Sequence, residues 1–145
     1  MKRVMAFTLM LSILMNTPAL AEKVVWQKDP VYEVDIDCDG RVDQVLYGTI
    51  SNDFVIKVKS SAYNTTSSLQ FGLGQSSRQD AICGLEPEFS KFESSSEQIK
   101  ELFGEEFEGY KDTGICFDLN ISGGECDSIN VFFNHKTQEL NWWRM

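Results

Sequence analysis

The segment VDQVLYGTISNDFVIKVK, residues 42–59, decides the fold class of this chain. Apolar and β-branched residues alternate or run together over residues 42–50 and again over residues 54–59, as they do in half-buried strands. Ser51, Asn52 and Asp53 separate the two runs and have the composition of a turn. The segment therefore predicts a β-hairpin.

Further strands are expected on both sides of this hairpin. Their segments are short, carry alternating or β-branched apolar residues and are bounded by turn residues. They span residues 31–34, 68–73, 115–121, 129–134 and 140–144. A parallel α/β sheet would need more helices than this chain offers. We therefore expect an α+β fold that is mainly β, an antiparallel meander of about six to seven strands with one short helix.

The one helix is expected between residues 95 and 103. Ser94 and Glu97 have the spacing of a capping box, and apolar residues recur behind them at helical intervals. Gly104 is expected to end the helix, because glycine readily adopts the left-handed conformation found at helix C-termini.

Two adjacent tryptophans, Trp142 and Trp143, lie in the last expected strand. Neighbouring side chains on a strand point to opposite faces of the sheet, so one of the two is expected in the core. The other either packs at a sheet edge or is exposed as a binding aromatic. Phe132 and Phe133, in a neighbouring expected strand, favour packing.

Residues 1–21 have the pattern of a secretory signal peptide. Lys2 and Arg3 give a positive start, a largely apolar stretch follows, and small residues precede a cut before Glu22. The apolar run is too short for a membrane anchor, which needs about 20 apolar residues. We therefore expect a bacterial protein, periplasmic or secreted. Residues 22–145 would form a single β-rich domain with no membrane span once the signal is removed.

The charge of the mature chain limits its partners. Removal of Lys2 and Arg3 leaves 11 basic residues against 22 acidic ones, a formal charge of −11. Such a field repels nucleic acid and anionic membranes, and it speeds encounter with cations or with a basic protein. A basic protein is therefore the partner class that charge favours, although a well-solvated surface accounts for the same composition. The sequence gives no indication of oligomeric state.

Four cysteines remain after the expected cut: Cys38, Cys83, Cys116 and Cys126. An even number in a small exported domain predicts disulfides, and a chain with one histidine and no CxxC motif is poorly supplied for zinc. Two disulfides allow three pairings. Short loop closure favours Cys116–Cys126 with Cys38–Cys83. A regular hairpin through the glycines at 123 and 124 would not place Cys116 opposite Cys126, so the pairing stays open.

The most specific functional motif is DIDCDGRVD, residues 35–43. Its carboxylates stand at loop positions 1, 3, 5 and 9 and belong to Asp35, Asp37, Asp39 and Asp43. Gly40 stands at position 6, where the backbone must turn sharply. Calcium takes six to eight oxygens in flexible geometry, which the aspartates, the carbonyl of Arg41 and water would supply. Position 12 is Leu46 rather than glutamate and strand-like segments flank the loop, so it is not an EF-hand.

This loop resembles the DxDxDGxxD calcium loops of FG-GAP and VCBS-type repeats, which join two β-strands. The resemblance covers residues 31–47 and implies that the four aspartates bind calcium together with the carbonyl of Arg41. Those repeats usually occur in series and form a propeller, whereas this chain has one copy. Cys38 also stands where a small or polar residue is more usual. The resemblance therefore extends to the loop and not to a propeller, and the alternative is an acidic turn that binds no metal.

Residue patterns for catalysis are weak. No GxSxG, GxGxxG or Walker-type motif occurs, the cysteines are expected to be oxidised, and His135 stands in an expected turn. We therefore expect that the protein is not an enzyme.

The first functional hypothesis is an exported, calcium-stabilised binding domain of unknown ligand. The alternative is an acidic inhibitor or immunity protein that neutralises a basic cell-wall hydrolase or toxin.

Overall fold

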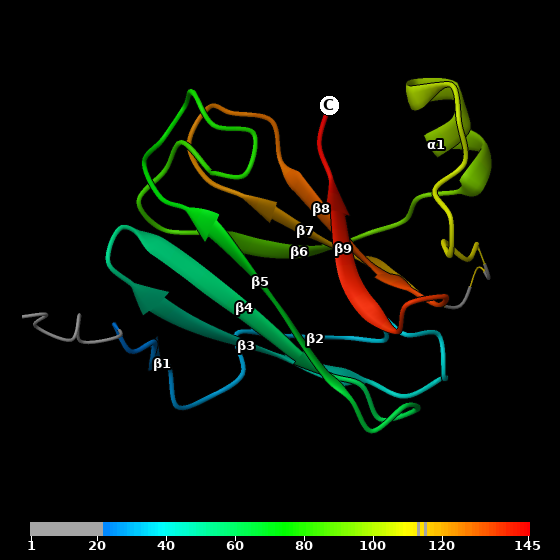
Figure 1. The fold of residues 1–145 in the computed structure, drawn as a ribbon, viewed down its shortest axis with the longest axis horizontal. Helices are drawn as coiled ribbons and strands as arrows, with labels where there is room; N and C mark the ends of the chain where they lie inside the picture. The colour runs from blue at the N-terminus through cyan, green and yellow to red at the C-terminus, as the bar shows by residue number, and fades with distance from the viewer. Residues whose placement is uncertain (1–21, 113, 115) are drawn as a thin grey trace, which may run out of the picture.

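The computed structural model describes residues 22–112, 114 and 116–145, so the expected signal peptide at residues 1–21 lies outside the described residues. The described residues form two antiparallel sheets and one short helix (Figure 1). In chain order the elements are β1 (Val25–Trp26), β2 (Tyr32–Val34), β3 (Asp43–Ile50), β4 (Asp53–Lys59), β5 (Thr66–Gly72), β6 (Glu88–Phe92), α1 (Ser96–Phe103), β7 (Asp118–Ser122), β8 (Ile129–Asn134) and β9 (Glu139–Trp143). The expected fold class is confirmed, with nine strands among the described residues.

The first sheet has the strand order β1-β3-β4-β5, and β2 also pairs with β3. The hairpin predicted at residues 42–59 is β3 with β4, and Ser51 in its turn adopts a φ of +49°. Val34, at the end of β2, pairs with Asp43, at the start of β3. β1 and β2 therefore lie one after the other along the side of β3 that β4 leaves free.

The second sheet is a meander with the order β6-β7-β8-β9. β7 begins at Asp118, so residues 116 and 117 of the expected strand are not part of it, and residue 115, where the apolar pattern predicts its start, lies outside the described residues. The sequence predicts neither β1 nor β6. β1 has only two residues, and the aromatic residues of β6, Phe89 and Phe92, are three positions apart, which breaks the two-residue alternation of a strand.

The two sheets pack face to face over one core to which both contribute (Figure 1). Fully buried side chains come from β3, β4 and β5 on one side and from β7 and β8 on the other: Val45, Phe54, Ile56, Phe71, Leu119, Ile121, Ile129 and Val131. Burial of each such side chain stabilises the fold by about 1.5–3 kcal/mol relative to exposure. The shared core fixes which loops of the two sheets meet at each end of the strands.

The helix α1 begins with a capping box formed by Ser95 and Gln98. The Ser95 hydroxyl accepts a hydrogen bond from the Gln98 amide, and the Gln98 side chain accepts one from the Ser95 amide. This box lies one residue beyond the one expected at Ser94, because the Ser94 hydroxyl donates to Asp118 instead. Gly104 ends the helix with a φ of +76°, as predicted. No helix in the described part of the chain is long and apolar enough to cross a membrane.

The helix and the chain that follows it cover the outer face of the second sheet. Trp143, 6% exposed, lies against Phe103 of α1, and Phe132, 2% exposed, shares this covered face. Trp142 contacts Phe71 of the core. Both tryptophans therefore take packing roles, one on each side of β9.

Candidate metal centre

The acidic loop closes a small hairpin between β2 and β3. Its ends are held together by the pairing of Val34 with Asp43. Cys38 and Gly40 adopt φ values of +61° and +82°, which fold the chain back within a few residues. A Cβ atom at Gly40 would meet no atom within 4 Å, so the need for glycine there comes from the backbone conformation and not from crowding.

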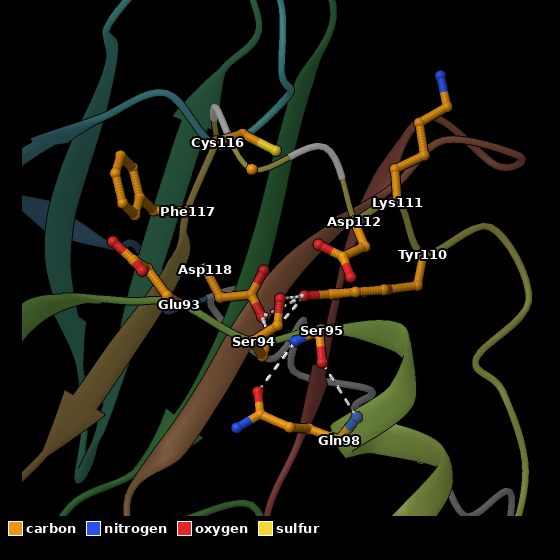
Figure 2. A pocket seen from close by; sticks show the side chains of 11 residues that line it. Glu93, Ser94, Ser95, Gln98, Tyr110, Lys111, Asp112, Cys116, Phe117 and Asp118 are labelled. Atoms are coloured by element: carbon orange, nitrogen blue, oxygen red, sulfur yellow. Dashed lines mark hydrogen bonds between the residues drawn. The ribbon is translucent and has the colours of Figure 1, made fainter.

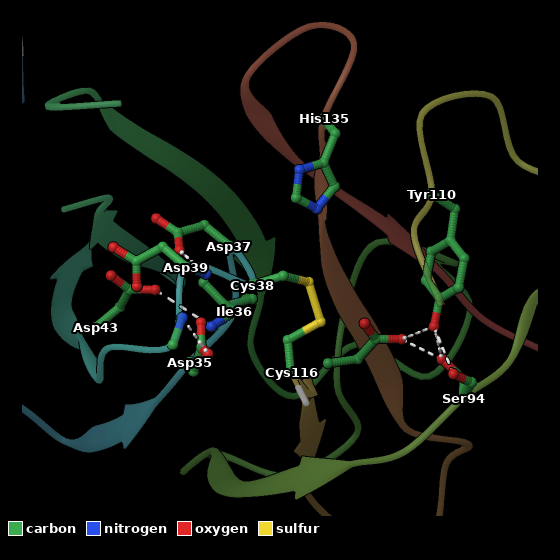
Figure 3. The surroundings of a disulfide bond; sticks show 12 residues. Asp35, Ile36, Asp37, Cys38, Asp39, Asp43, Ser94, Tyr110, Cys116 and His135 are labelled. Atoms are coloured by element: carbon green, nitrogen blue, oxygen red, sulfur yellow. Dashed lines mark hydrogen bonds between the residues drawn. A yellow bond between two sulfur atoms is a disulfide. The ribbon is translucent and has the colours of Figure 1, made fainter. Parts of the chain in front are cut away.

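Three carboxylates of this loop converge. Asp35, Asp37 and Asp39 each offer a carboxylate oxygen, and these oxygens lie within 4.8 Å of one another (Figure 3). Calcium binds oxygens at 2.3–2.6 Å, so two ligands on opposite sides of one ion lie about 5 Å apart. The spacing of the three side chains therefore fits a single ion of this size.

Hydrogen bonds to backbone amides hold the carboxylates in this arrangement. The Gly40 amide donates to Asp35 Oδ2 at 3.0 Å and the Asp39 amide donates to Asp37 Oδ1 at 3.1 Å. The Arg41 amide donates to Asp39 Oδ1 at 2.7 Å. Each aspartate thus uses one oxygen to shape the loop, and these oxygens retain a second lone pair.

The connection between β4 and β5 supports the same side chains from outside the loop. The Ser60 hydroxyl donates to Asp37 Oδ2 at 2.5 Å, and the Ser61 hydroxyl donates to Asp39 Oδ2 at 2.7 Å. The bond from Ser61 is the main cause that lowers the pKa of Asp39. Two loops that are distant in the sequence therefore fix the carboxylates at positions 3 and 5.

Two buried carboxylate oxygens have no hydrogen-bond partner within the described residues: Asp35 Oδ1 and Asp43 Oδ1. Burial of a carboxylate oxygen without a partner is costly, and a bound cation removes that cost. Burial is also the main cause that raises the pKa of Asp35, and the charge of Asp37 adds to the rise. These oxygens are the observation that distinguishes this loop from an ordinary solvated acidic turn.

Asp43 is placed differently from the three converging aspartates. It is 2% exposed and lies beneath the loop, where its Oδ2 accepts a hydrogen bond from the Ile36 amide at 3.2 Å. Burial raises its pKa to about 6, and the nearby charge of Asp37 adds to the rise. Direct ligation by Asp43 and by the carbonyl of Arg41 stays a prediction, whereas the convergence of the other three is seen directly.

The four cysteines form two disulfides, Cys38–Cys116 and Cys83–Cys126, with Cα–Cα distances of 4.8 and 5.5 Å. The pairing that short loop closure favours is wrong. The two sheets bring distant segments together: the Phe117 amide donates to the Asp35 carbonyl at 3.0 Å, and the Gly84 amide donates to the Gly123 carbonyl at 2.8 Å. The cost of loop closure grows only slowly with length, so packing decides the pairing.

A second polar cluster, which the sequence does not predict, lies beside the start of α1 and lines a cavity of about 330 Å³ (Figure 2). Ser94 donates its hydroxyl hydrogen to Asp118, and Tyr110 donates to the Ser94 carbonyl at 2.8 Å. Asp118 is 7% exposed, and burial raises its pKa to about 6. The three residues come from separate segments with no motif spacing, so no sequence signal points to them.

No protein-family model matches this chain, and no curated protein or solved structure does so either. The resemblance to FG-GAP and VCBS-type repeats therefore stays limited to the acidic loop itself. The fold and the site define the class: a two-sheet antiparallel β domain with two disulfides and an aspartate loop with the geometry to hold a metal ion.

Proposed function

We propose that residues 22–145 are an exported binding domain, periplasmic or secreted, whose β scaffold is stabilised by one calcium ion in the loop at residues 35–43. The observation that carries this proposal is the convergence of Asp35, Asp37 and Asp39 next to a buried Asp35 oxygen that lacks a partner. The two disulfides support an oxidising compartment.

Calcium is the cation that this donor set favours. All the converging donors are carboxylate oxygens, which suit hard cations. Magnesium demands near-ideal octahedral geometry at 2.0–2.1 Å and gives up water reluctantly, whereas calcium accepts irregular oxygen shells. Zinc prefers cysteine and histidine ligands, and Cys38 in this loop is in a disulfide.

The ion would act on stability rather than on chemistry. It would neutralise carboxylates that crowd one loop, satisfy a buried oxygen and hold the junction of β2 and β3 against the loop that carries Ser60 and Ser61.

We also propose that the protein is not an enzyme. All four cysteines are in disulfides, so none is available as a free thiol nucleophile.

Isothermal titration calorimetry of the oxidised mature protein tests the proposal. We expect one calcium site. Asp39→Asn should lower its calcium affinity at least about tenfold, because affinity depends on the number of negatively charged ligands. Asp39 is partly exposed, and asparagine keeps an acceptor oxygen for the Arg41 amide, so the variant retains the fold. Asp29→Asn removes an equal charge from an exposed site elsewhere and should leave the affinity unchanged. If the wild type takes up no calcium at millimolar concentration, the loop is only an acidic turn.

A second candidate function is inhibition of a basic cell-wall hydrolase or toxin. The specific observation is a surface groove of about 500 Å³ that is lined by Glu105, Glu106 and Glu108 beside Phe107. Carboxylates next to an aromatic ring suit a basic side chain, through ion pairing and cation–π contact. Peptidoglycan hydrolysis by a basic hydrolase should fall when the domain is added. Unchanged rates across a panel of such hydrolases would remove this candidate.

A further inference from the structure

One disulfide lies inside the candidate calcium loop. Cys38 stands between Asp37 and Asp39, two of the three converging residues, and is joined to Cys116 just before β7 (Figure 3). The Phe117 amide donates to the carbonyl of Asp35 at 3.0 Å, so the bridge is reinforced by a backbone contact. The acidic loop of the first sheet is therefore covalently joined to the segment that precedes β7 in the second sheet.

This attachment opposes two tendencies of the loop. Cys38 holds a φ of +61°, a conformation that residues other than glycine adopt at a cost and keep only when their surroundings impose it. The carboxylates of Asp35, Asp37 and Asp39 also repel one another, because their oxygens lie within 4.8 Å of one another. Without the bridge to Cys116, both effects favour an opened loop in which the carboxylates separate.

We propose that the Cys38–Cys116 disulfide is a redox switch for the cation site, closed and calcium-competent when oxidised and open with weak affinity when reduced. The inference rests on the proposed calcium function. It adds a regulatory property, because binding and disulfide state become thermodynamically linked. Linkage is reciprocal: the bridge strengthens calcium binding, and calcium makes the bridge harder to reduce by the same factor.

The switching step is thiol–disulfide exchange with a dithiol reductant. One thiolate of the dithiol attacks a sulfur of the bridge and forms a mixed disulfide, and the second thiolate then displaces the protein sulfur. The bond between the two protein sulfurs is broken and two protein thiols form, which take up the protons that the dithiol gave up. The dithiol leaves as its cyclic disulfide. Cys38 and Cys116 are both partly exposed.

The second disulfide of the protein is a matched control. Cys83 and Cys126 are likewise partly exposed, but they join the connection after β5 to the turn that follows β7. Cys116 precedes β7 and Cys126 follows it, so the two bridges lie at opposite ends of that strand. Loss of Cys83–Cys126 removes a cross-link of the same kind without freeing the calcium loop.

The first test compares calcium affinity by calorimetry in three oxidised proteins. The wild type and a Cys83→Ser/Cys126→Ser variant should bind one ion with affinities that agree within about threefold. Cys38→Ser/Cys116→Ser should bind at least about tenfold more weakly, which is in the usual range for coupled sites. Equal affinity in all three would overturn the redox inference and leave the calcium function standing. No binding by the oxidised wild type would overturn the calcium function itself, and the inference with it.

The second test uses only unaltered cysteines, so it decides the matter even if the Cys38→Ser/Cys116→Ser variant does not fold. Wild-type protein is equilibrated with dithiothreitol at set ratios of its reduced to its oxidised form, and the free thiols are alkylated and assigned by mass spectrometry. Saturating calcium should raise at least about fivefold the ratio that reduces half of the Cys38–Cys116 bridge and leave the ratio for Cys83–Cys126 unchanged. Asp39→Asn should abolish this protection. Equal ratios with and without calcium, or equal protection of both bridges, would contradict the switch.

Discussion

At the scale of single residues, the domain keeps carboxylates in two contrasting environments. In the loop, Asp35 has a buried oxygen with no hydrogen-bond partner among the described residues. Asp118 is also buried, but the Ser94 hydroxyl donates to it, and the Tyr110 hydroxyl lies 3.3 Å from its Oδ2. The cation that we propose would complete the first environment, whereas the second is complete in itself, and this difference separates the candidate metal centre from the polar cluster near α1.

Asp118 should make the stability of the domain depend on pH. Its pKa is about 6 in the folded protein, above the ordinary 3.8, so the folded state binds the proton more tightly than the unfolded state does. Its stabilising contribution is therefore full below about pH 4 and is lost as pH rises through about 6. Asp118→Asn should remove this loss. The free energy of unfolding of the variant relative to wild type should increase by up to about 3 kcal/mol between pH 4 and pH 7.

Urea denaturation at both pH values, in calcium-free buffer, measures this difference. Asp29→Asn is the control, because Asp29 is exposed and its charge is not among the causes that raise the pKa of Asp118. Its stability profile should run parallel to that of the wild type. A parallel profile for Asp118→Asn as well would show that Asp118 is not the titrating group.

At the scale of elements, a sequence pattern predicts a strand or helix end correctly where its hydrogen bonds join neighbouring residues. The prediction fails where a residue distant in the sequence takes one of the hydrogen-bonding groups. The β3–β4 hairpin and the glycine end of α1 follow from neighbouring residues alone. The start of the helix does not, because Asp118 takes the Ser94 hydroxyl and leaves capping to Ser95. β6 is also missed, since its pairing with β7 depends on a strand that lies after the helix.

Ser95→Ala should destabilise the domain by about 1 kcal/mol, the usual effect of losing an N-cap side chain. The loss should be seen in global unfolding because α1 covers Trp143 on the second sheet. Ser96→Ala is the matched control, since Ser96 is the first helical residue and alanine is tolerated there. Urea denaturation followed by circular dichroism gives both values. A loss at Ser96 as large as that at Ser95 would place the cap elsewhere.

At the scale of the whole molecule, stability depends on links between the two sheets. The shared core, the bridge from Cys38 to Cys116 and the bond between Phe117 and Asp35 all cross from one sheet to the other. A ligand that binds the loop only in the folded state therefore stabilises the entire domain and not the loop alone.

Calcium should accordingly raise the melting temperature of the oxidised protein. At about 100 times the dissociation constant the stabilisation should be roughly 2.7 kcal/mol, which is several degrees for a domain of this size. Magnesium should give a smaller shift because of its stricter geometry. Differential scanning calorimetry measures both, with Asp39→Asn expected to lose the shift and Asp29→Asn to keep it. An equal rise with magnesium would indicate general charge screening instead of a calcium site.

The charge of residues 22–145 is −11 and should govern the rate of association with any basic partner. If a basic hydrolase is inhibited, surface plasmon resonance should show an association rate that falls steeply as salt rises, with a smaller change in dissociation. Glu105→Gln/Glu106→Gln should slow association if the acidic groove is the contact. A rate that is indifferent to ionic strength would remove charge as the basis of recognition.

The sequence by itself determined what depends on neighbours along the chain: the antiparallel β fold, the end of the helix at Gly104 and the aspartate loop with Gly40 at its turn. Alternation, turn composition and ligand spacing are local patterns, so they can be interpreted without coordinates. Only the tertiary structure decided the pairing of Cys38 with Cys116, the burial of Asp43 beneath the loop and the Ser94–Tyr110–Asp118 cluster. Each of these depends on which loops the shared core brings together. The free energy of packing the two sheets is larger than the differences in loop-closure entropy between alternative pairings, which are all that sequence separation can predict.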